Sequence, residues 1–132
     1  MQVAIILIVV SLLCPAAWCA SARDLIGTWE GEPKCTFPDS ACHDERARYR
    51  IVADQKNPGK FNLLGYKVVN GDAVFMGTLE CEYHGSQSTL TCTGHTARQD
   101  DWEFQVSGDT MTGTLKLGAE KALYRRITLR KK

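Results

Sequence analysis

Residues 81–95 read CEYHGSQSTLTCTGH and contain two Cys-x-x-His pairs separated by a polar stretch. The same stretch fits a metal site or a β-hairpin closed by a disulfide. A hairpin that turns between Ser86 and Gln87 places Cys81 opposite Cys92, with Cβ atoms about 4.5–5.5 Å apart. That spacing is close to what a disulfide needs. The apolar side chains then share one face of the hairpin, and the acidic and threonine side chains share the other.

A metal site conflicts with this hairpin. Residues three apart in a strand point to opposite faces, so His84 diverges from Cys81 and His95 diverges from Cys92. The two histidines would also lie roughly 20 Å apart at the rise of a strand. Zinc ligands must all lie within about 2.3 Å of the metal. The pattern therefore predicts a Cys81–Cys92 disulfide and no metal site.

Short stretches of alternating apolar and polar residues, broken by turn residues, run through the rest of the chain. Alternation is typical of strands with one buried face, and Asn70-Gly71 favours a tight hairpin. The expected strands are 24–32, 46–53, 60–69, 73–83, 89–94, 101–106, 110–117 and 121–130. Because nearly every connection is short, the sequence predicts an all-β fold, a small antiparallel eight-stranded up-and-down barrel. A β-sandwich is the main alternative.

The first 22 residues have the pattern of a secretory signal peptide. The apolar run 3–13 is too short to span a membrane as a helix, and the small residues at 20–22 suit a signal peptidase. We expect cleavage after Ala22 and a single domain over 23–132; an uncleaved N-terminal anchor is the alternative. No later segment is apolar enough to span a membrane, so the mature chain is predicted to be secreted or periplasmic.

The cysteine count indicates disulfides, and the net charge argues against one class of function. Four cysteines follow the predicted cleavage site, and an even number in an exported chain favours disulfides. With Cys81 and Cys92 paired, the second predicted disulfide joins Cys35 to Cys42. The formal net charge is +1, which argues against nucleic-acid binding.

The predicted mature chain carries Gly27-Thr28-Trp29 near its start. This tripeptide resembles the Gly-x-Trp motif of the first lipocalin strand and the Gly-Thr-Trp start of avidin-like barrels. The resemblance implies a lipocalin-like barrel in which Trp29 plugs one end and an Arg of the last strand packs on the indole. Arg125, on the expected inward face, is the best match, and such a cation–π contact is favourable. The second lipocalin signature and the helix after the barrel are missing, so the resemblance names no ligand.

The sequence shows no evident arrangement of catalytic residues. His43, Asp44 and Glu45 are consecutive, so their side chains fan out, and a solvated cluster is the expected reading. His84 and His95 would each need a further partner to act as a base. The sequence therefore predicts no enzyme, no catalytic residue and no cofactor.

The first functional hypothesis is a barrel that binds a small apolar or amphipathic molecule in its interior. The inward residues predicted to line the site are Tyr49, Ile51, Phe61, Leu63, Trp102, Phe104, Met111 and Leu115. The same residues are expected if the interior is simply filled, as in a structural envelope protein.

The second hypothesis is a protein-binding module, such as an inhibitor of an extracellular hydrolase. The irregular segment 35–42 would be tied by its disulfide and present Phe37 and Pro38 at its tip. A constrained apolar tip loses less entropy on binding. The predicted partner is thus either a small lipophilic molecule or an extracellular protein.

Overall fold

The computed structural model describes residues 21–37 and 43–132. One helical turn, α1 (Ala22–Leu25), precedes the strands. The strands are β1 (Gly27–Gly31), β2 (Lys34–Cys35), β3 (Ala47–Ala53), β4 (Lys60–Val69), β5 (Asp72–His84), β6 (Thr89–Thr93), β7 (Asp101–Ser107), β8 (Thr110–Leu117) and β9 (Ala122–Lys131). A short 3-10 turn over Gly85–Gln87 joins β5 to β6. Among the described residues, no helix has the length and apolar character needed to cross a membrane.

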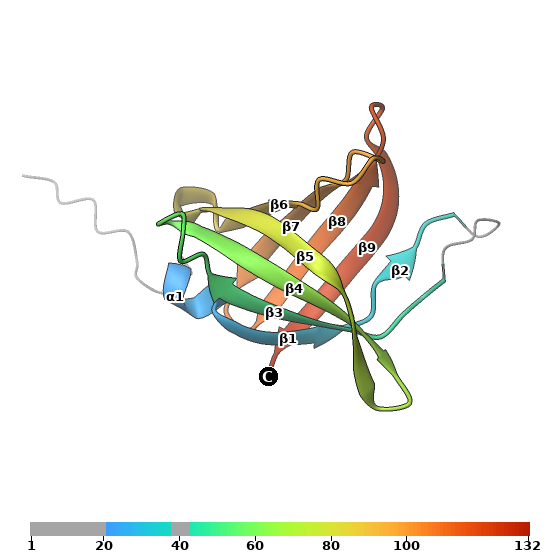
Figure 1. Ribbon diagram of the computed structural model, residues 1–132, viewed down its shortest axis with the longest axis horizontal. Coiled ribbons are helices and arrows are strands. Elements are labelled where there is room, and N and C mark those ends of the chain that lie inside the picture. Colours follow the sequence, from blue (N-terminus) through green and yellow to red (C-terminus); the bar gives the residue numbers. More distant parts are fainter. Residues whose placement is uncertain (1–20, 38–42) are drawn as a thin grey trace, which may run out of the picture.

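The strands form one antiparallel sheet that closes on itself (Figure 1). From β3 to β9 each strand pairs with the next, and β1 pairs with both β3 and β9. Gly31 permits the closing contact, because a Cβ there would lie 1.9 Å from the carbonyl oxygen of Thr128. The result is a closed eight-stranded barrel, with β2 as an extra short strand beside β9.

The barrel predicted from the sequence is confirmed, with two local differences. The first strand is shorter than the expected 24–32, because its beginning forms α1. Ser21 donates from its backbone N and its Oγ to Asp24 Oδ2, at 2.9 and 3.1 Å, an arrangement that favours a helical start. β2 was not predicted, since a strand of two residues is too short to show a pattern.

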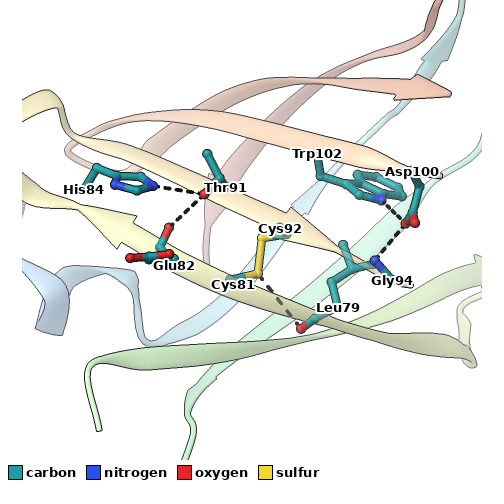
Figure 2. The surroundings of a disulfide bond; sticks show 9 residues. All are labelled: Leu79, Cys81, Glu82, His84, Thr91, Cys92, Gly94, Asp100 and Trp102. Atoms are coloured by element: carbon teal, nitrogen blue, oxygen red, sulfur yellow. Dashed lines mark hydrogen bonds between the residues drawn. A yellow bond between two sulfur atoms is a disulfide. The ribbon is translucent and has the colours of Figure 1, made fainter. Parts of the chain in front are cut away.

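The hairpin of β5 and β6 has the predicted register. Cys81 pairs with Cys92, and their sulfur atoms are bonded at 2.00 Å (Figure 2). Both cysteines are buried, so the disulfide belongs to the interior side of the barrel wall. The second predicted disulfide would end on Cys42, which lies outside the described residues, so Cys35–Cys42 stays a prediction.

Trp29 closes one end of the barrel and is fully buried. Its Nε1 donates to the carbonyl oxygen of Leu25 at 2.9 Å, so α1 lies at this end (Figure 1). The cation on the indole is Lys131, whose Nζ lies 5.6 Å from the ring centroid. The same Nζ donates to the carbonyl oxygen of Asp24 at 2.6 Å. Helical turn, indole and ammonium group together form the closed end.

The predicted packing of Arg125 on Trp29 is wrong. Trp29 is paired with Lys131 across β1 and β9, whereas Arg125 is paired with Leu115 and Cys35. The two cations share the inward alternation of β9, but they are separated by roughly 20 Å at the rise of a strand. Alternation in the sequence identifies the inward face, and only the pairing register sets the level along the barrel.

The half of the barrel next to Trp29 is filled with packed side chains. Phe104 is fully buried, and its ring lies so close to Gly113 that a Cβ there would come within 2.5 Å of it. The other large buried side chains of this half include Leu25, Ile51, Phe61, Val106, Met111 and Leu129.

The hairpin of β4 and β5 extends beyond the body of the barrel (Figure 1). It turns at Asn70-Gly71, as predicted, and both residues have positive φ. Tyr66 and Phe75 pack on each other with ring centroids 5.5 Å apart. Several apolar side chains of the hairpin are exposed, namely Val69, Val74, Phe75 and Met76.

Candidate ligand-binding site

The end of the barrel opposite Trp29 holds a pocket of about 800 Å³. Its wall comes from β3, β4, β5, β7, β8 and β9, together with the β6–β7 connection over 94–100. A pocket to which strands all around the barrel contribute is the mouth of the barrel and not a groove on its outer surface. Mouths of β-barrels are common binding sites for small molecules.

Small residues make room for this pocket. The lining includes Ala47 on β3, Gly65 on β4, Gly77 on β5 and Gly94 after β6. Gly65 and Gly77 are directly paired, so neighbouring strands both lack a side chain at this level. A Cβ on Gly77 would meet nothing within 4 Å, whereas a Cβ on Gly94 would lie 2.7 Å from Asp100 Oδ2. The interior is therefore open beside Gly77 and filled where Trp29 lies.

Four of the predicted interior residues line the pocket. They are Tyr49, Leu63, Trp102 and Leu115. The other four predicted residues, Ile51, Phe61, Phe104 and Met111, do not line it and pack in the buried core instead. Inward orientation was predicted for all eight, but the level along the barrel separates the pocket residues from the core residues.

An aromatic cluster forms the boundary between the core and the pocket. Tyr49 meets Trp102 edge-on, with centroids 6.4 Å apart and planes at 88°. It also meets Phe104 at 6.4 Å and 69°. Trp102 and Phe104 are stacked at 6.4 Å. Since Phe104 is fully buried, it belongs to the core, while the other two rings face the pocket.

Asp100 positions Trp102 and the β6–β7 connection (Figure 2). Its Oδ2 accepts from Trp102 Nε1 and from the backbone N of Gly94, both at 2.8 Å. Its Oδ1 accepts from the backbone N and the Oγ1 of Thr96, at 3.3 and 3.2 Å. Burial raises the pKa of Asp100, but hydrogen bonds from Trp102, Gly94 and Thr96 outweigh it and leave the pKa below its usual value. The carboxylate thus acts as a fixed anchor for one side of the mouth.

An ion pair between the segment before β3 and strand β9 lies at the pocket wall. Arg125 Nη2 lies 3.2 Å from Glu45 Oε1, and the two side chains are 12% and 25% exposed. Tyr49 is 7% exposed, and its pKa is raised by burial, partly opposed by the Arg125 charge and increased further by Glu45. The phenol therefore stays protonated at neutral pH and can donate a hydrogen bond.

The rim of the mouth carries part of the predicted protein-contact loop. Phe37 is 45% exposed, and its ring lies 6.4 Å from that of Tyr124. The Cζ of Arg125 lies 5.7 Å from the centroid of the same Tyr124 ring. Pro38, the second residue predicted for this loop, lies outside the described residues. The described part of the loop therefore adjoins the pocket.

Sequence reasoning missed most of the other residues of the mouth, and Glu45, Arg98 and Tyr124 show why. Glu45 was read as part of a solvated cluster, but it reaches back to Arg125. Arg98 lines the pocket from a connection that has no periodic pattern. Tyr124 lines it because an irregular register near Leu115 and Lys116 shifts the alternation of β9. A bulge of this kind leaves no signal in the alternation itself.

The two histidines of the opening stretch do not gather around a metal. His84 Nε2 lies 3.0 Å from Thr91 Oγ1 (Figure 2), and His95 Nε2 lies 2.7 Å from Glu80 Oε2. Over 21–37 and 43–132, no group of three or more His, Cys, Asp or Glu side chains is placed to hold a metal ion. With the sulfur atoms of the stretch bonded to each other, the disulfide interpretation is confirmed.

Comparisons with known proteins support the architecture and no more. No protein-family profile matches the chain, and no curated protein matches it in sequence. Solved structures do match, among them the crystal structure of Rv2717c from M. tuberculosis, at a TM-score of 0.55 and 11% identity over 83% of this chain and 94% of that one. At this identity the likeness shows the fold alone. The chain is a small closed antiparallel β-barrel, consistent with the lipocalin-like and avidin-like architecture but not assigned to either family.

Proposed function

We propose that this protein is an exported, non-enzymatic β-barrel that binds a small apolar or amphipathic molecule in its open mouth. The observation that carries the proposal is the pocket of about 800 Å³ lined by Tyr49, Leu63, Trp102 and Leu115. Ligand pockets typically measure about 300–1,000 Å³ and combine apolar walls with a few polar groups. The mouth has both properties, because Arg125 and Glu45 also line it.

The core beneath the pocket supports a binding role over a purely structural one. Phe104 and the residues below it are packed and buried, so the barrel does not need a ligand to be stable. The pocket above them has Ala47, Gly65 and Gly77 among its lining residues, although larger apolar side chains that filled this space would stabilise the barrel by burial. An open pocket makes the barrel less stable than a filled core would. A ligand that occupies the pocket would explain why this space is kept open.

Export is part of the same proposal. The disulfide between Cys81 and Cys92 is typical of oxidising compartments outside the cytosol. The predicted signal peptide over 1–22 and the predicted Cys35–Cys42 disulfide agree with that location. A secreted or periplasmic carrier would meet its ligand in water, where an apolar molecule gains most from a pocket.

A fluorescence titration tests the proposal. The purified, oxidised protein is titrated with a lipophilic probe while tryptophan emission is recorded. We expect saturable quenching at one site per chain, lost in Leu115→Arg, which places a large cation in the pocket. The matched control is Thr112→Arg on the exposed face of the same strand, which should bind as the wild type does. A folded wild type without saturable binding would refute the proposal.

A second candidate function is a protein contact through the mouth-side loop. The supporting observation is Phe37, which is 45% exposed at the rim beside Tyr124. An inhibitor of an extracellular hydrolase would use such an apolar tip. Assay of the protein against a panel of extracellular hydrolases tests this idea. Inhibition that Phe37→Asp abolishes, with an unchanged unfolding curve, would favour the inhibitor; a lack of inhibition across the panel would count against it.

A further inference from the structure

The polar groups of the mouth point to the chemical class of the ligand, and this inference rests on the proposed function. Arg125 is the central group. Its side chain is 12% exposed and faces Glu45 through Nη2 alone. A guanidinium carries five N–H donors in a planar fork that can bind a carboxylate through two parallel hydrogen bonds. The single contact at 3.2 Å leaves most of that donor capacity unused among the described residues.

The hydroxyl of Tyr49 is the second group. Tyr49 is 7% exposed and lines the pocket, and among the described residues its hydroxyl has no hydrogen-bond partner. Its ring is held edge-on by Trp102 and Phe104, so the hydroxyl has a fixed direction. No fully buried side-chain oxygen or nitrogen of the described residues lacks a hydrogen-bond partner, so this hydroxyl opens onto the pocket and is not sealed in the core. It can therefore donate to an acceptor on a molecule bound in the pocket.

The nearby carboxylates differ in how firmly their own contacts hold them. Asp100 already accepts from Trp102, Gly94 and Thr96, so it is not free to move. Asp44 is held by the backbone N of Cys35 and by Lys34. Glu45 holds Arg125 through one contact, and with its side chain 25% exposed it is the more exposed member of that pair. Glu45 is therefore the carboxylate most easily displaced into water.

The rest of the mouth adds a second cation, Arg98. Arg98 lines the pocket and is exposed, and no ion pair to it is found among the described residues. The mouth thus holds two guanidinium groups, Arg98 and Arg125, and two carboxylates, Glu45 and Asp100. The donors to Asp100 are neutral, so its charge remains. When Glu45 turns out into water, one positive charge is left over, and an incoming anion would balance it.

We propose that the ligand is an anionic amphiphile, a long-chain carboxylic acid in its simplest form. Its carboxylate displaces Glu45 and binds the Arg125 guanidinium and the Tyr49 hydroxyl. Its apolar chain lies along Leu63, Trp102 and Leu115. Glu45 is the resident counter-ion, which keeps Arg125 paired when the pocket is empty and competes with the ligand head group.

A paired titration tests this inference. A long-chain carboxylic acid and the alcohol of the same chain length are each titrated against the purified, oxidised protein. Hydrogen bonds to charged groups are strong enough to favour the acid by about tenfold or more. Arg125→Gln should reduce this acid-to-alcohol preference to about one. The matched control is the exposed neighbour Arg126→Gln, which should keep the preference.

Two further variants sharpen the result. Glu45→Gln removes the competing charge while keeping the side chain's size, so it should tighten acid binding several-fold and raise the preference. Tyr49→Phe keeps the ring and removes the hydroxyl, so it should lower the preference by a few-fold. Urea unfolding of each variant establishes that the barrel is intact. Weaker acid binding in Glu45→Gln would contradict the displacement of Glu45.

The outcomes separate this inference from the function on which it rests. If wild type binds acid and alcohol equally, or prefers the alcohol, the anionic head group is refuted while the apolar pocket stands. If Arg126→Gln abolishes the preference as fully as Arg125→Gln, the effect is general surface charge and the site is refuted. If the folded protein binds neither compound and no lipophilic probe, both the inference and the proposed function fail.

Discussion

The two ends of the barrel are built from the same alternating pattern but serve different purposes. At one end, Trp29 and Phe104 are fully buried and Lys131 lies over the indole. At the other, Gly65 and Gly77 face each other across paired strands, and a pocket of about 800 Å³ remains. The size of the inward side chains at each level, and not the alternation itself, decides whether the barrel is core or cavity.

The two ends also use their cations differently. Lys131 donates to the backbone of Asp24 and packs on Trp29, so its contacts are within the closed end. Arg125 faces Glu45 at the wall of the open pocket. One cation stabilises the fold, and the other is placed where it can meet a ligand. Substitutions at the two ends should therefore separate stability from binding.

The largest expected effect is on stability at the closed end. Trp29→Ala removes a fully buried indole and should lower the free energy of unfolding by about 3–5 kcal/mol. Trp102→Ala should cost less, because one side of this indole faces the pocket. Urea unfolding followed by circular dichroism measures both. Equal losses at the two tryptophans would contradict the difference between a filled end and an open end.

A smaller and pH-dependent effect is expected at Asp100. Its pKa is lowered in the folded protein, so the carboxylate form favours folding. The stabilisation is complete above the ordinary pKa of 3.8 and is lost as the pH falls through the lower folded value. Asp100→Asn should cost about 1–3 kcal/mol near pH 6 and progressively less in acid.

Urea unfolding of wild type and Asp100→Asn, from near pH 6 down through the ordinary pKa of 3.8, measures the difference in the free energy of unfolding. The control is Asp72→Asn, at an exposed position on β5, which should leave the pH dependence of wild type in place. A constant difference between wild type and Asp100→Asn at every pH would show that Asp100 does not act through its charge.

The smallest expected effect is the loss of stability when Lys131, the cation of the closed end, is replaced. Lys131→Gln removes the cation–π contact on Trp29 and should cost about 0.5–1 kcal/mol of stability, with ligand affinity unchanged. Lys116→Gln, on the exposed face of β8, is the control and should alter neither quantity. Thermal unfolding and the probe titration give the two readouts. If Lys131→Gln weakened the binding free energy of the probe by more than it lowered the free energy of unfolding, the two ends would not be independent.

Much of the fold was predictable because its signals are local. The Cys81–Cys92 pairing followed from hairpin geometry, and the turn at Asn70-Gly71 followed from a dipeptide preference. The cation on Trp29 was assigned to the wrong residue, because Arg125 and Lys131 have the same alternation and differ only in register. Register depends on pairing between distant strands, which one sequence does not display.

The candidate site was only half predictable for a related reason. Tyr49, Leu63, Trp102 and Leu115 were chosen for their inward orientation, and they do line the pocket. Glu45 could not be chosen, because its role depends on a side chain that is distant in the sequence. The glycines that open the mouth gave no warning either, since a glycine in a strand has several possible meanings.

A single titration by nuclear magnetic resonance tests the difference between the two ends most directly. The indole N–H groups of Trp29 and Trp102 are hydrogen-bonded to different partners at opposite ends, and each gives its own signal in ¹⁵N-labelled protein. On addition of a long-chain carboxylic acid, we predict saturable shifts of Trp102 and of the Gly65 and Gly77 amides, while Trp29 stays unmoved. Shifts centred on Trp29, or no shifts in the folded protein, would contradict an open mouth above a closed core.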